Sequence, residues 1–202
     1  MKDKLKLYLV TDSKILKNRD FYKCIEDSLK GGVTTLQLRE KEASGKDFLE
    51  KAYNLRKLTR KYNVTFIIND RVDIALLVDA DGVHVGQSDI SASEVRKLIG
   101  SNKIVGVSTR TLEEAEEAKK NGADYLGVGA MFNTTTKLDA KLVSIETLIN
   151  IKKNTNLPIV AIGGITLQNK NVLSTCKIDG YAIVSAILGV EDIYKETQKW
   201  ID

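Results

Sequence analysis

Three polar side chains follow a strongly apolar stretch near the start of the chain. Gln37, Arg39 and Lys41 come after Val-Thr-Thr-Leu at residues 33–36, a run that predicts a buried strand. Side chains alternate between the faces of a strand, so Gln37 and Arg39 share one face, which Lys41 continues if the chain stays extended. An amide, a guanidinium and an ammonium together suit a dense anion such as phosphate or pyrophosphate. A strand end with solvated charges would give the same pattern.

Two aspartates follow later strand-like stretches. Asp70 comes after Phe-Ile-Ile-Asn, and Asp89 closely follows Gly-Val-His-Val. If these strand ends lie near Arg39 and Lys41, the two carboxylates suit Mg2+, which typically takes one or two carboxylates plus substrate oxygens and water. Each aspartate would also fit the N-cap of a following helix, so two interpretations stay open.

Glycine and hydroxyl residues supply a third group of candidates. Gly163 and Gly164 end another apolar stretch, and backbone without side chains can approach a ligand closely. Ser185 ends the next stretch, and residues 134–137 read Thr-Thr-Thr-Lys within a long loop. Three hydroxyls and an ammonium fit a second phosphate or a lid over a site. A tight turn and a flexible polar loop are the structural alternatives.

Other residue types that often carry catalysis are sparse. His84 is the only histidine and lies inside an apolar stretch, which predicts a hydrogen-bonded core residue rather than a catalytic base. Cys24 and Cys176 are far apart in helix-like segments, as is typical of buried free thiols. A zinc site or a Cys–His nucleophile is therefore not expected. Gly127 and Gly129 begin a dinucleotide-like pattern, but its third glycine is missing.

The elements that must position these residues alternate along the whole chain. Eight apolar stretches, each followed by a helix-like segment, predict strands at residues 5–10, 33–39, 65–68, 82–85, 104–107, 125–128, 158–162 and 181–184. Short, continuously apolar strands are typical of a parallel sheet covered by helices. Eight such units in 202 residues predict an α/β fold, a single TIM (β/α)8 barrel domain over residues 1–202. A doubly wound open sheet shares the alternation and is the alternative.

The candidate functional residues fall at one relative position in these units. In a TIM barrel the carboxyl ends of the strands converge on the face that holds active sites. The residues at or just past those ends are Gln37, Arg39, Asn69, Asp70, Asp89, Ser108, Gly163, Gly164 and Ser185. The two glycines and Ser185 would then occupy the phosphate position common after strands seven and eight.

Composition and charge narrow the function classes. The net charge is only +4 with acids and bases interspersed, so nucleic acid is not an expected partner. No apolar run approaches the roughly 18 residues needed to span a bilayer, so no membrane association is expected. The first residues pass straight into a strand-like run without a signal-peptide pattern, which predicts a cytoplasmic protein.

Taken in order, the motifs resemble those of the thiamine phosphate synthase family from about Leu9 to Leu188. They are Gln-Leu-Arg-Glu-Lys at 37–41, Ile-Asn-Asp at 68–70, Gly-Val-His-Val-Gly-Gln-Ser-Asp at 82–89, Val-Gly-Val-Ser at 105–108, Thr-Thr-Thr-Lys at 134–137 and Ala-Ile-Gly-Gly-Ile at 161–165. Each motif alone is moderately specific, whereas the ordered set is highly specific.

The resemblance implies a transferase that joins hydroxymethylpyrimidine pyrophosphate to hydroxyethylthiazole phosphate, giving thiamine phosphate and pyrophosphate. It places the pyrimidine pyrophosphate on Gln37, Leu38, Arg39, Glu40, Lys41, Asn69, Ser108 and Lys137. It implies catalytic roles for Arg39, Lys41, Ser108 and Lys137, and Mg2+ on Asp70 and Asp89. It places the thiazole phosphate on Thr134, Thr135, Thr136, Gly164, Val184 and Ser185, without an essential side chain at Thr135.

The chemistry of these residue types agrees with the implied dissociative mechanism. Negative charge grows on the departing pyrophosphate, and fixed cations such as Arg39, Lys41, Lys137 and Mg2+ stabilise it. The thiazole nitrogen captures a pyrimidine carbocation, so no protein nucleophile is required. The side chain of Glu40, on the opposite strand face from Arg39, has no individual role in this interpretation.

Two departures and two rival functions accompany the resemblance. Ala130 and Asn133 stand where the family usually has prolines, which would loosen the threonine loop. A thiazole tautomerase-like isomerase is the nearest rival, but that relative carries a functional histidine where this chain has Arg110. A non-catalytic thiamine-related regulator would be expected to lose charged site residues that are all present. The expected partners are the two small-molecule substrates; a homo-oligomer is compatible with the sequence, which does not set the oligomeric state.

Overall fold

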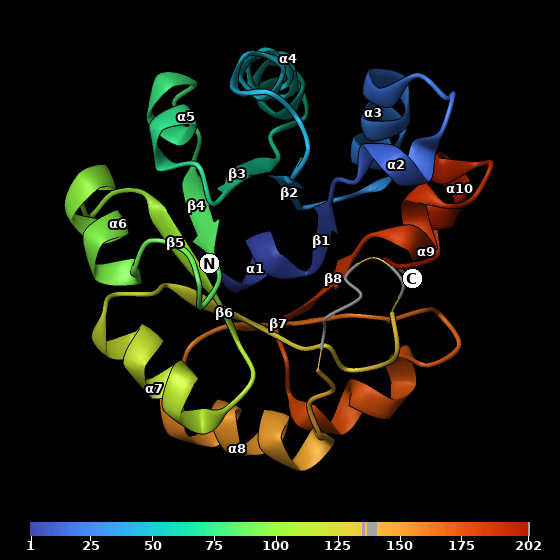
Figure 1. The fold of residues 1–202 in the computed structure, drawn as a ribbon. Helices are drawn as coiled ribbons and strands as arrows, with labels where there is room; N and C mark the ends of the chain where they lie inside the picture. The colour runs from blue at the N-terminus through green and yellow to red at the C-terminus, as the bar shows by residue number, and fades with distance from the viewer. Residues whose placement is uncertain (135, 137–140, 202) are drawn as a thin grey trace.

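Eight parallel strands close into a barrel in strict sequence order (Figure 1). The structure is a computed structural model that describes residues 1–134, 136 and 141–201. The strands are β1 Leu7–Val10, β2 Thr35–Leu38, β3 Thr65–Asn69, β4 Gly82–Val85, β5 Ile104–Thr109, β6 Tyr125–Val128, β7 Ile159–Ile162 and β8 Gly180–Ile183. Pairing of β1 with β8 closes the ring, so the expected TIM barrel is confirmed and the open doubly wound sheet is wrong.

The described helices comprise a short helix, α1, which lies near the centre of the view, and an outer ring of helices from α2 to α10 around the strands (Figure 1). They are α1 Lys2–Leu5, α2 Ser13–Leu16, α3 Phe21–Gly31, α4 Gly45–Tyr62, α5 Val72–Leu77, α6 Ala92–Ile99, α7 Leu112–Lys120, α8 Ile145–Thr155, α9 Ser185–Leu188 and α10 Ile193–Gln198. A 3-10 helix, η1 Lys170–Cys176, stands where the α-helix after β7 was expected. Among the helices that the structure describes, none is long and apolar enough to cross a membrane.

Local capping explains where several helices begin. The side chains of Ser44, Ser91, Thr111 and Ser144 each accept a hydrogen bond from the backbone N–H three residues later. This contact satisfies one of the unpaired N–H groups of a helix start. These four side chains therefore fix where α4, α6, α7 and α8 begin.

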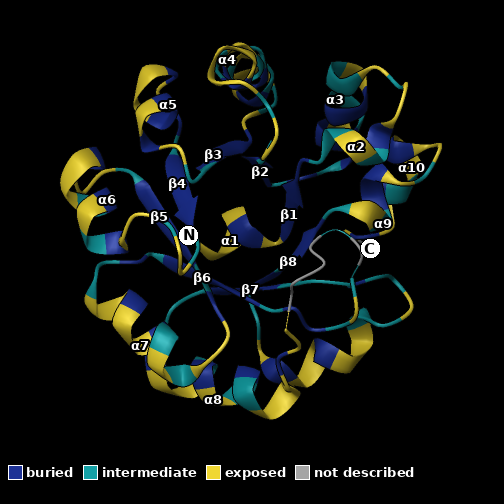
Figure 2. Cartoon of the chain, viewed as in Figure 1, coloured by how far each residue is buried: buried dark blue, intermediate teal, exposed yellow. Residues whose placement is uncertain are grey.

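The barrel has an inner and an outer apolar core. Outward-facing strand residues such as Leu36 and Leu38 pack against the helices in one large cluster. A smaller cluster fills the interior, and it includes Tyr8, Ile67 and Tyr125. Figure 2 shows the strands buried and the outward helix faces exposed. Since both strand faces are buried, the parity of a residue decides whether it reaches the helices or the barrel interior.

Candidate active site

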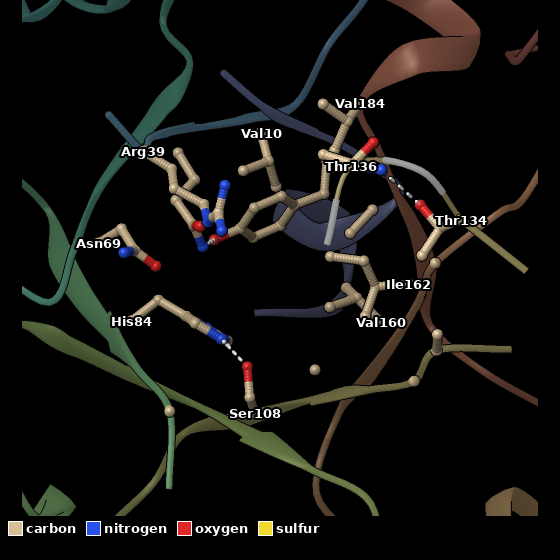
Figure 3. A pocket seen from close by; sticks show the side chains of 18 of the residues that line it. Val10, Arg39, Asn69, His84, Ser108, Thr134, Thr136, Val160, Ile162 and Val184 are labelled. Carbon is tan, nitrogen blue, oxygen red and sulfur yellow. Dashed lines mark hydrogen bonds between the residues drawn. The ribbon is translucent and has the colours of Figure 1, made fainter. Parts of the chain in front are cut away.

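A cavity of about 420 Å³ opens at the carboxyl ends of the strands, and residues at the ends of all eight strands or in the following loops line it. This volume suits a small-molecule ligand. Figure 3 shows Arg39, Asn69 and His84 along one side, with Thr134, Thr136 and Val184 along the other. The apolar side chains of Val160 and Ile162 lie between those sides. The cavity therefore presents two different walls.

Most of the predicted site residues meet here. The lining includes Gln37, Arg39, Lys41, Asn69, Asp70, Asp89, Ser108, Thr134, Thr136, Gly164, Val184 and Ser185. Thr135 and Lys137 lie outside the described residues, so their predicted roles stay predictions. Leu38 and Glu40 do not line the cavity, and the reasons differ.

Strand parity separates the members of the motif at residues 37–41. Gln37 points into the barrel, is 4% exposed, and donates from Nε2 to the Tyr8 hydroxyl at 2.8 Å. Leu38 points outward into the core between sheet and helices, with no exposed surface. The Leu38 side chain therefore packs the barrel wall and is not available to a ligand in the cavity.

Glu40 anchors the end of β2 from outside the cavity. Its carboxylate accepts hydrogen bonds from Thr11 at 3.1 Å, Ser13 at 2.6 Å and Lys51 at 3.0 Å. The Thr11 hydroxyl also accepts from the backbone N–H of Arg39 at 2.9 Å. A nearly buried carboxylate needs such partners. The Glu40 carboxylate thus fixes the backbone from which Arg39 and Lys41 project, and the predicted part of Glu40 in substrate binding stays a prediction.

The two aspartates are not helix caps. The residue at the N-cap of α5 is Arg71 and that of α6 is Ser91, and neither cap uses an aspartate side chain. Asp70 instead adopts the left-handed region with φ 60°, a strained conformation for a residue other than glycine that is typical of functional sites. The Asp89 carboxylate accepts from the Gly86 N–H at 2.8 Å and lies beside Asp70.

The electrostatics of this pair follow from their proximity. Burial, and then the hydrogen bond and negative charge of Asp89, raise the pKa of Asp70 to about 6. Lys41 and Arg39 oppose this rise in pKa because their positive charges favour the carboxylate. A cation beside both aspartates would relieve the repulsion that raises the Asp70 pKa.

Two consecutive glycines after β7 bring bare backbone to the opposite wall. Gly163 has φ 97° and Gly164 has φ 64°, which glycine adopts without the strain of a side chain. A Cβ at Gly164 would lie 2.3 Å from the Asn133 carbonyl oxygen, so the backbone of the threonine loop needs this glycine. Ser185 begins α9 on the neighbouring strand end. This wall offers backbone groups and hydroxyls, and Lys141, which is hydrogen-bonded to Ala130 beside this turn, also lines the cavity.

The sequence interpretation missed two tyrosines: Tyr8, which lines the cavity, and Tyr125, which lies beneath it in the inner core. Tyr8 lines the cavity floor, and its hydroxyl lies 2.7 Å from that of Tyr125. His84 is buried and hydrogen-bonded, as expected, with Nδ1 2.9 Å from Tyr125 and Nε2 2.9 Å from Ser108. Burial lowers the pKa of His84 to about 4, so its imidazole is neutral at pH 7. His84 also lines the cavity. The sequence signal for its inward direction was that residues two apart in a strand share a face, which groups His84 with Gly82 and Gly86.

The fold and this mouth define a class of protein: a TIM-barrel enzyme whose strand ends combine cations, paired carboxylates and a glycine-rich phosphate position. The sequence model of the family described as Thiamine monophosphate synthase matches residues 7–187. The chain therefore belongs to the thiamine monophosphate synthase family.

Individual relatives agree with this assignment. The chain is 65% identical over 200 residues to a Thiamine-phosphate synthase of Clostridioides difficile, covering 99% of this chain and 95% of the relative. It is 53% identical over 197 residues to a Thiamine-phosphate synthase of Clostridium acetobutylicum, covering 98% and 93%. A solved structure of thiamine phosphate pyrophosphorylase from Pyrococcus furiosus matches with a TM-score of 0.91 at 40% identity, covering 99% and 95%.

Proposed function

We propose that this protein condenses hydroxymethylpyrimidine pyrophosphate with hydroxyethylthiazole phosphate, forming thiamine phosphate and releasing pyrophosphate. The observation that carries the proposal is the convergence of two unlike walls on one cavity. Arg39, Lys41, Asp70 and Asp89 line one wall, and Gly164 belongs to the other. The family membership and the named relatives support the same transferase activity.

The charged wall fits the pyrophosphate group. Arg39 can donate a fork of N–H groups to phosphate oxygens, and Lys41 adds a compact positive charge. Both side chains project from backbone that Thr11 and Glu40 hold in place. Cations fixed before the reaction stabilise developing negative charge without reorganising in the transition state. Arg39 and Lys41 thus favour departure of pyrophosphate from the pyrimidine carbon.

Asp70 and Asp89 fit a bound Mg2+. Their oxygens are the ligand type that Mg2+ prefers, and Mg2+ commonly uses only one or two carboxylates together with substrate phosphate oxygens. The described residues hold no cluster of three or more histidine, cysteine or acidic side chains, so protein ligands alone would not complete a cage. The raised pKa of Asp70 is the electrostatic mark of a site that favours added positive charge. Mg2+ bound here would neutralise charge on the leaving pyrophosphate.

The opposite wall fits the thiazole phosphate. The backbone N–H groups around Gly164 and Ser185 occupy the position where TIM barrels commonly bind phosphate, after strands seven and eight. Thr134 and Thr136 add hydroxyls, and the Thr134 Oγ1 accepts from the Thr136 N–H at 3.2 Å. With one substrate on each wall, the thiazole nitrogen can meet the pyrimidine carbon between them. Holding two reactants in this way removes much of the entropic barrier.

No nucleophilic residue is needed for this reaction. Departure of pyrophosphate leaves a carbocation on the pyrimidine, and the lone pair of the thiazole nitrogen forms the new C–N bond. The residues that line the cavity include no cysteine, and their one imidazole, His84, is neutral and buried. The protein therefore contributes binding and charge stabilisation. The cytoplasmic location and the use of only small-molecule partners stay predictions.

The test incubates purified protein with both substrates and Mg2+ and identifies the products by mass. We expect thiamine phosphate to appear only when both substrates are present. Interconversion of thiazole tautomers without thiamine phosphate would replace this proposal with the isomerase. Binding of thiamine-related ligands without turnover would replace it with the regulator.

A further inference from the structure

A chain of hydrogen bonds crosses the barrel interior and ends at Ser108. Gln37 Nε2 donates to the Tyr8 hydroxyl, which lies 2.7 Å from the Tyr125 hydroxyl. Tyr125 contacts His84 Nδ1 at 2.9 Å. His84 Nε2 contacts the Ser108 Oγ, also at 2.9 Å (Figure 3). Tyr125 is fully buried and does not line the cavity. Any influence of Tyr125 on a ligand must therefore pass through its neighbours.

Two glycines make room for this chain. A Cβ at Gly106 on β5 would lie 2.2 Å from the Tyr125 ring carbon Cζ and 2.3 Å from its hydroxyl oxygen. A Cβ at Gly127 on β6 would lie 3.1 Å from His84 Cε1, tighter than an ordinary contact. The backbone register places Gly106 opposite Tyr125. The barrel interior is thus shaped around polar aromatic side chains where aliphatic packing would be simpler.

Counting protons gives the chain a direction. The Gln37 amide nitrogen donates to Tyr8, so the single proton of the Tyr8 hydroxyl needs another acceptor. Among the described residues the only such partner is the Tyr125 oxygen. Because buried hydroxyl protons are rarely left without an acceptor, Tyr8 donates to Tyr125, and Tyr125 in turn donates to a neighbouring atom.

The direction continues through the imidazole. The partner of Tyr125 is His84 Nδ1, which must then be the unprotonated nitrogen. A neutral imidazole carries one N–H, so Nε2 holds the proton and donates to the Ser108 Oγ. Ser108 accepts at its oxygen and keeps its own proton free for the cavity that it lines.

We propose that Tyr8 and Tyr125 are positioning residues that act through His84 to make Ser108 a hydrogen-bond donor toward the substrate. Ser108 would thereby select a substrate with an acceptor atom at this point, either a ring nitrogen of a heteroaromatic base or a phosphate oxygen. A substrate that presents an N–H there would meet an opposing proton. The inference rests on the proposed function only in assuming that substrate reaches Ser108.

The first test measures the tautomer of His84 directly. The chain has one histidine, so protein labelled with 15N-histidine gives a single pair of ring nitrogen signals. We expect two-bond 1H–15N correlation spectra of the wild type to show the proton on Nε2 and none on Nδ1. A proton on Nδ1 would reverse the chain, make Ser108 donate to His84, and overturn the proposal. This measurement requires neither turnover nor a variant.

The second test removes the link with Tyr125→Phe. The variant keeps the ring but deletes the donor to Nδ1, so we expect a mixture of the two His84 tautomers. Tyr181→Phe is the matched control, because Tyr181 lies on β8 and packs against Trp200, outside this chain. An unchanged tautomer in Tyr125→Phe would contradict the relay. If Tyr125→Phe does not fold, Tyr8→Phe serves instead, and we expect partial loss of the Nε2–H form.

The third test identifies the acceptor. Inorganic pyrophosphate and hydroxymethylpyrimidine are titrated separately, by calorimetry, into the wild type, Tyr125→Phe and Tyr181→Phe. We expect Tyr125→Phe to weaken the ligand that carries the acceptor about tenfold, the effect of one buried hydrogen bond. Unchanged affinity for both ligands would overturn the assigned role of Ser108. Failure to form thiamine phosphate, with the Nε2–H tautomer present, would refute the proposed function and leave the relay intact.

Discussion

At the scale of single residues, Asp70 combines strained backbone with an unfavourable charge. Its pKa is raised to about 6 by burial and by Asp89, from an ordinary value of 3.8. The folded state therefore holds the Asp70 proton more tightly than the unfolded state does. Protonation of Asp70 therefore adds to the free energy of unfolding. This contribution is fully present below pH 4 and is lost as the pH rises through 6.

Asp70→Asn should therefore stabilise the protein while abolishing its activity. Asn keeps the left-handed backbone accessible and removes the charge. We expect the free energy of unfolding at pH 8 without Mg2+ to rise by about 1 kcal/mol, since half exposure screens much of the shift. The gain should largely disappear at pH 4, where Asp70 is protonated in the folded state and partly protonated in the unfolded state. Urea unfolding at the two pH values measures it.

Asp73→Asn is the matched control for this experiment. Asp73 lies on α5 close to Asp70, and its pKa is lowered by a hydrogen bond from Arg71. Its replacement should slightly destabilise the protein at pH 8 and leave turnover unchanged. The same gain in stability from both variants, or from Asp70→Asn at both pH values, would refute the proposed origin of the Asp70 pKa.

Lys137 carries the corresponding prediction for the threonine loop. Lys137→Ala should cut thiamine phosphate formation by roughly a hundredfold, because the family resemblance assigns its ammonium to stabilising charge on the departing pyrophosphate. The melting temperature should stay within a degree or two of the wild type. Lys120→Ala, at the end of α7, is the control for removing a surface charge. Wild-type turnover by folded Lys137→Ala would remove Lys137 from the mechanism.

The charged residues of the site could be predicted from the sequence. Arg39, Lys41, Asp70 and Asp89 stood out because charged groups seldom end apolar strands without a function. The role of Glu40 was not predictable because its partners Thr11, Ser13 and Lys51 are distant in sequence, and only the fold brings them together.

At the scale of elements, the turn after β7 depends on backbone that only glycine tolerates. In Gly164→Ala the new Cβ would lie 2.3 Å from the Asn133 carbonyl oxygen, at φ 64°. We expect the KM for thiazole phosphate to rise at least tenfold as this wall shifts. The variant should also lose more stability than the roughly 1–2 kcal/mol of left-handed strain alone.

Gly100→Ala separates strain from collision. Gly100 has φ 75° with ψ −176°, a conformation that also favours glycine, but a Cβ there would meet nothing within 4 Å. This variant should lose only the strain energy and keep the wild-type KM. Thermal unfolding and steady-state kinetics of both variants check the comparison. Equal KM values for Gly164→Ala and the wild type would remove Gly164 from the thiazole phosphate wall.

The sequence predicted the elements well but not the inner face of the strands. Leu7, Tyr8 and Leu9 form one apolar run, and nothing in its composition tells that Tyr8 alone points inward. Continuous apolar strands of a parallel sheet hide their parity because both faces are buried. The same ambiguity concealed the inward direction of Tyr125. The glycine opposite it, Gly106, was a sequence signal for this direction, because a residue without a side chain leaves room for a large neighbouring side chain.

At the scale of the whole molecule, a ligand bound in the cavity should stabilise the fold, because residues from the ends of all eight strands line that cavity. Mg2+ with pyrophosphate at about 100 times the dissociation constant should add about 2.7 kcal/mol to the free energy of unfolding. The rise in melting temperature should vanish in Asp89→Asn, because this variant lacks one of the two carboxylates that are proposed to bind Mg2+. Differential scanning calorimetry measures both. An undiminished rise in Asp89→Asn would remove Asp89 from the Mg2+ site.

The whole architecture was predictable because eight repeating units in a short chain leave few ways to bury all the strands. The closure of β1 on β8 then brings residues from 37 to 185 to one mouth. Neighbouring strands explain why Asp70 and Asp89 meet, since β3 and β4 are paired. The two-walled shape of the cavity needed the structure, because it depends on side-chain directions.

The most direct test of the account is the simultaneous measurement of both products from purified protein with Mg2+. Thiamine phosphate and pyrophosphate should form in equal amounts, and omission of either substrate should stop thiamine phosphate formation. Arg39→Ala should slow both products together, since the same cation serves the step that releases pyrophosphate. Pyrophosphate released without matching thiamine phosphate when both substrates are present, or no product at all, would contradict the central claim that this cavity joins the two substrates.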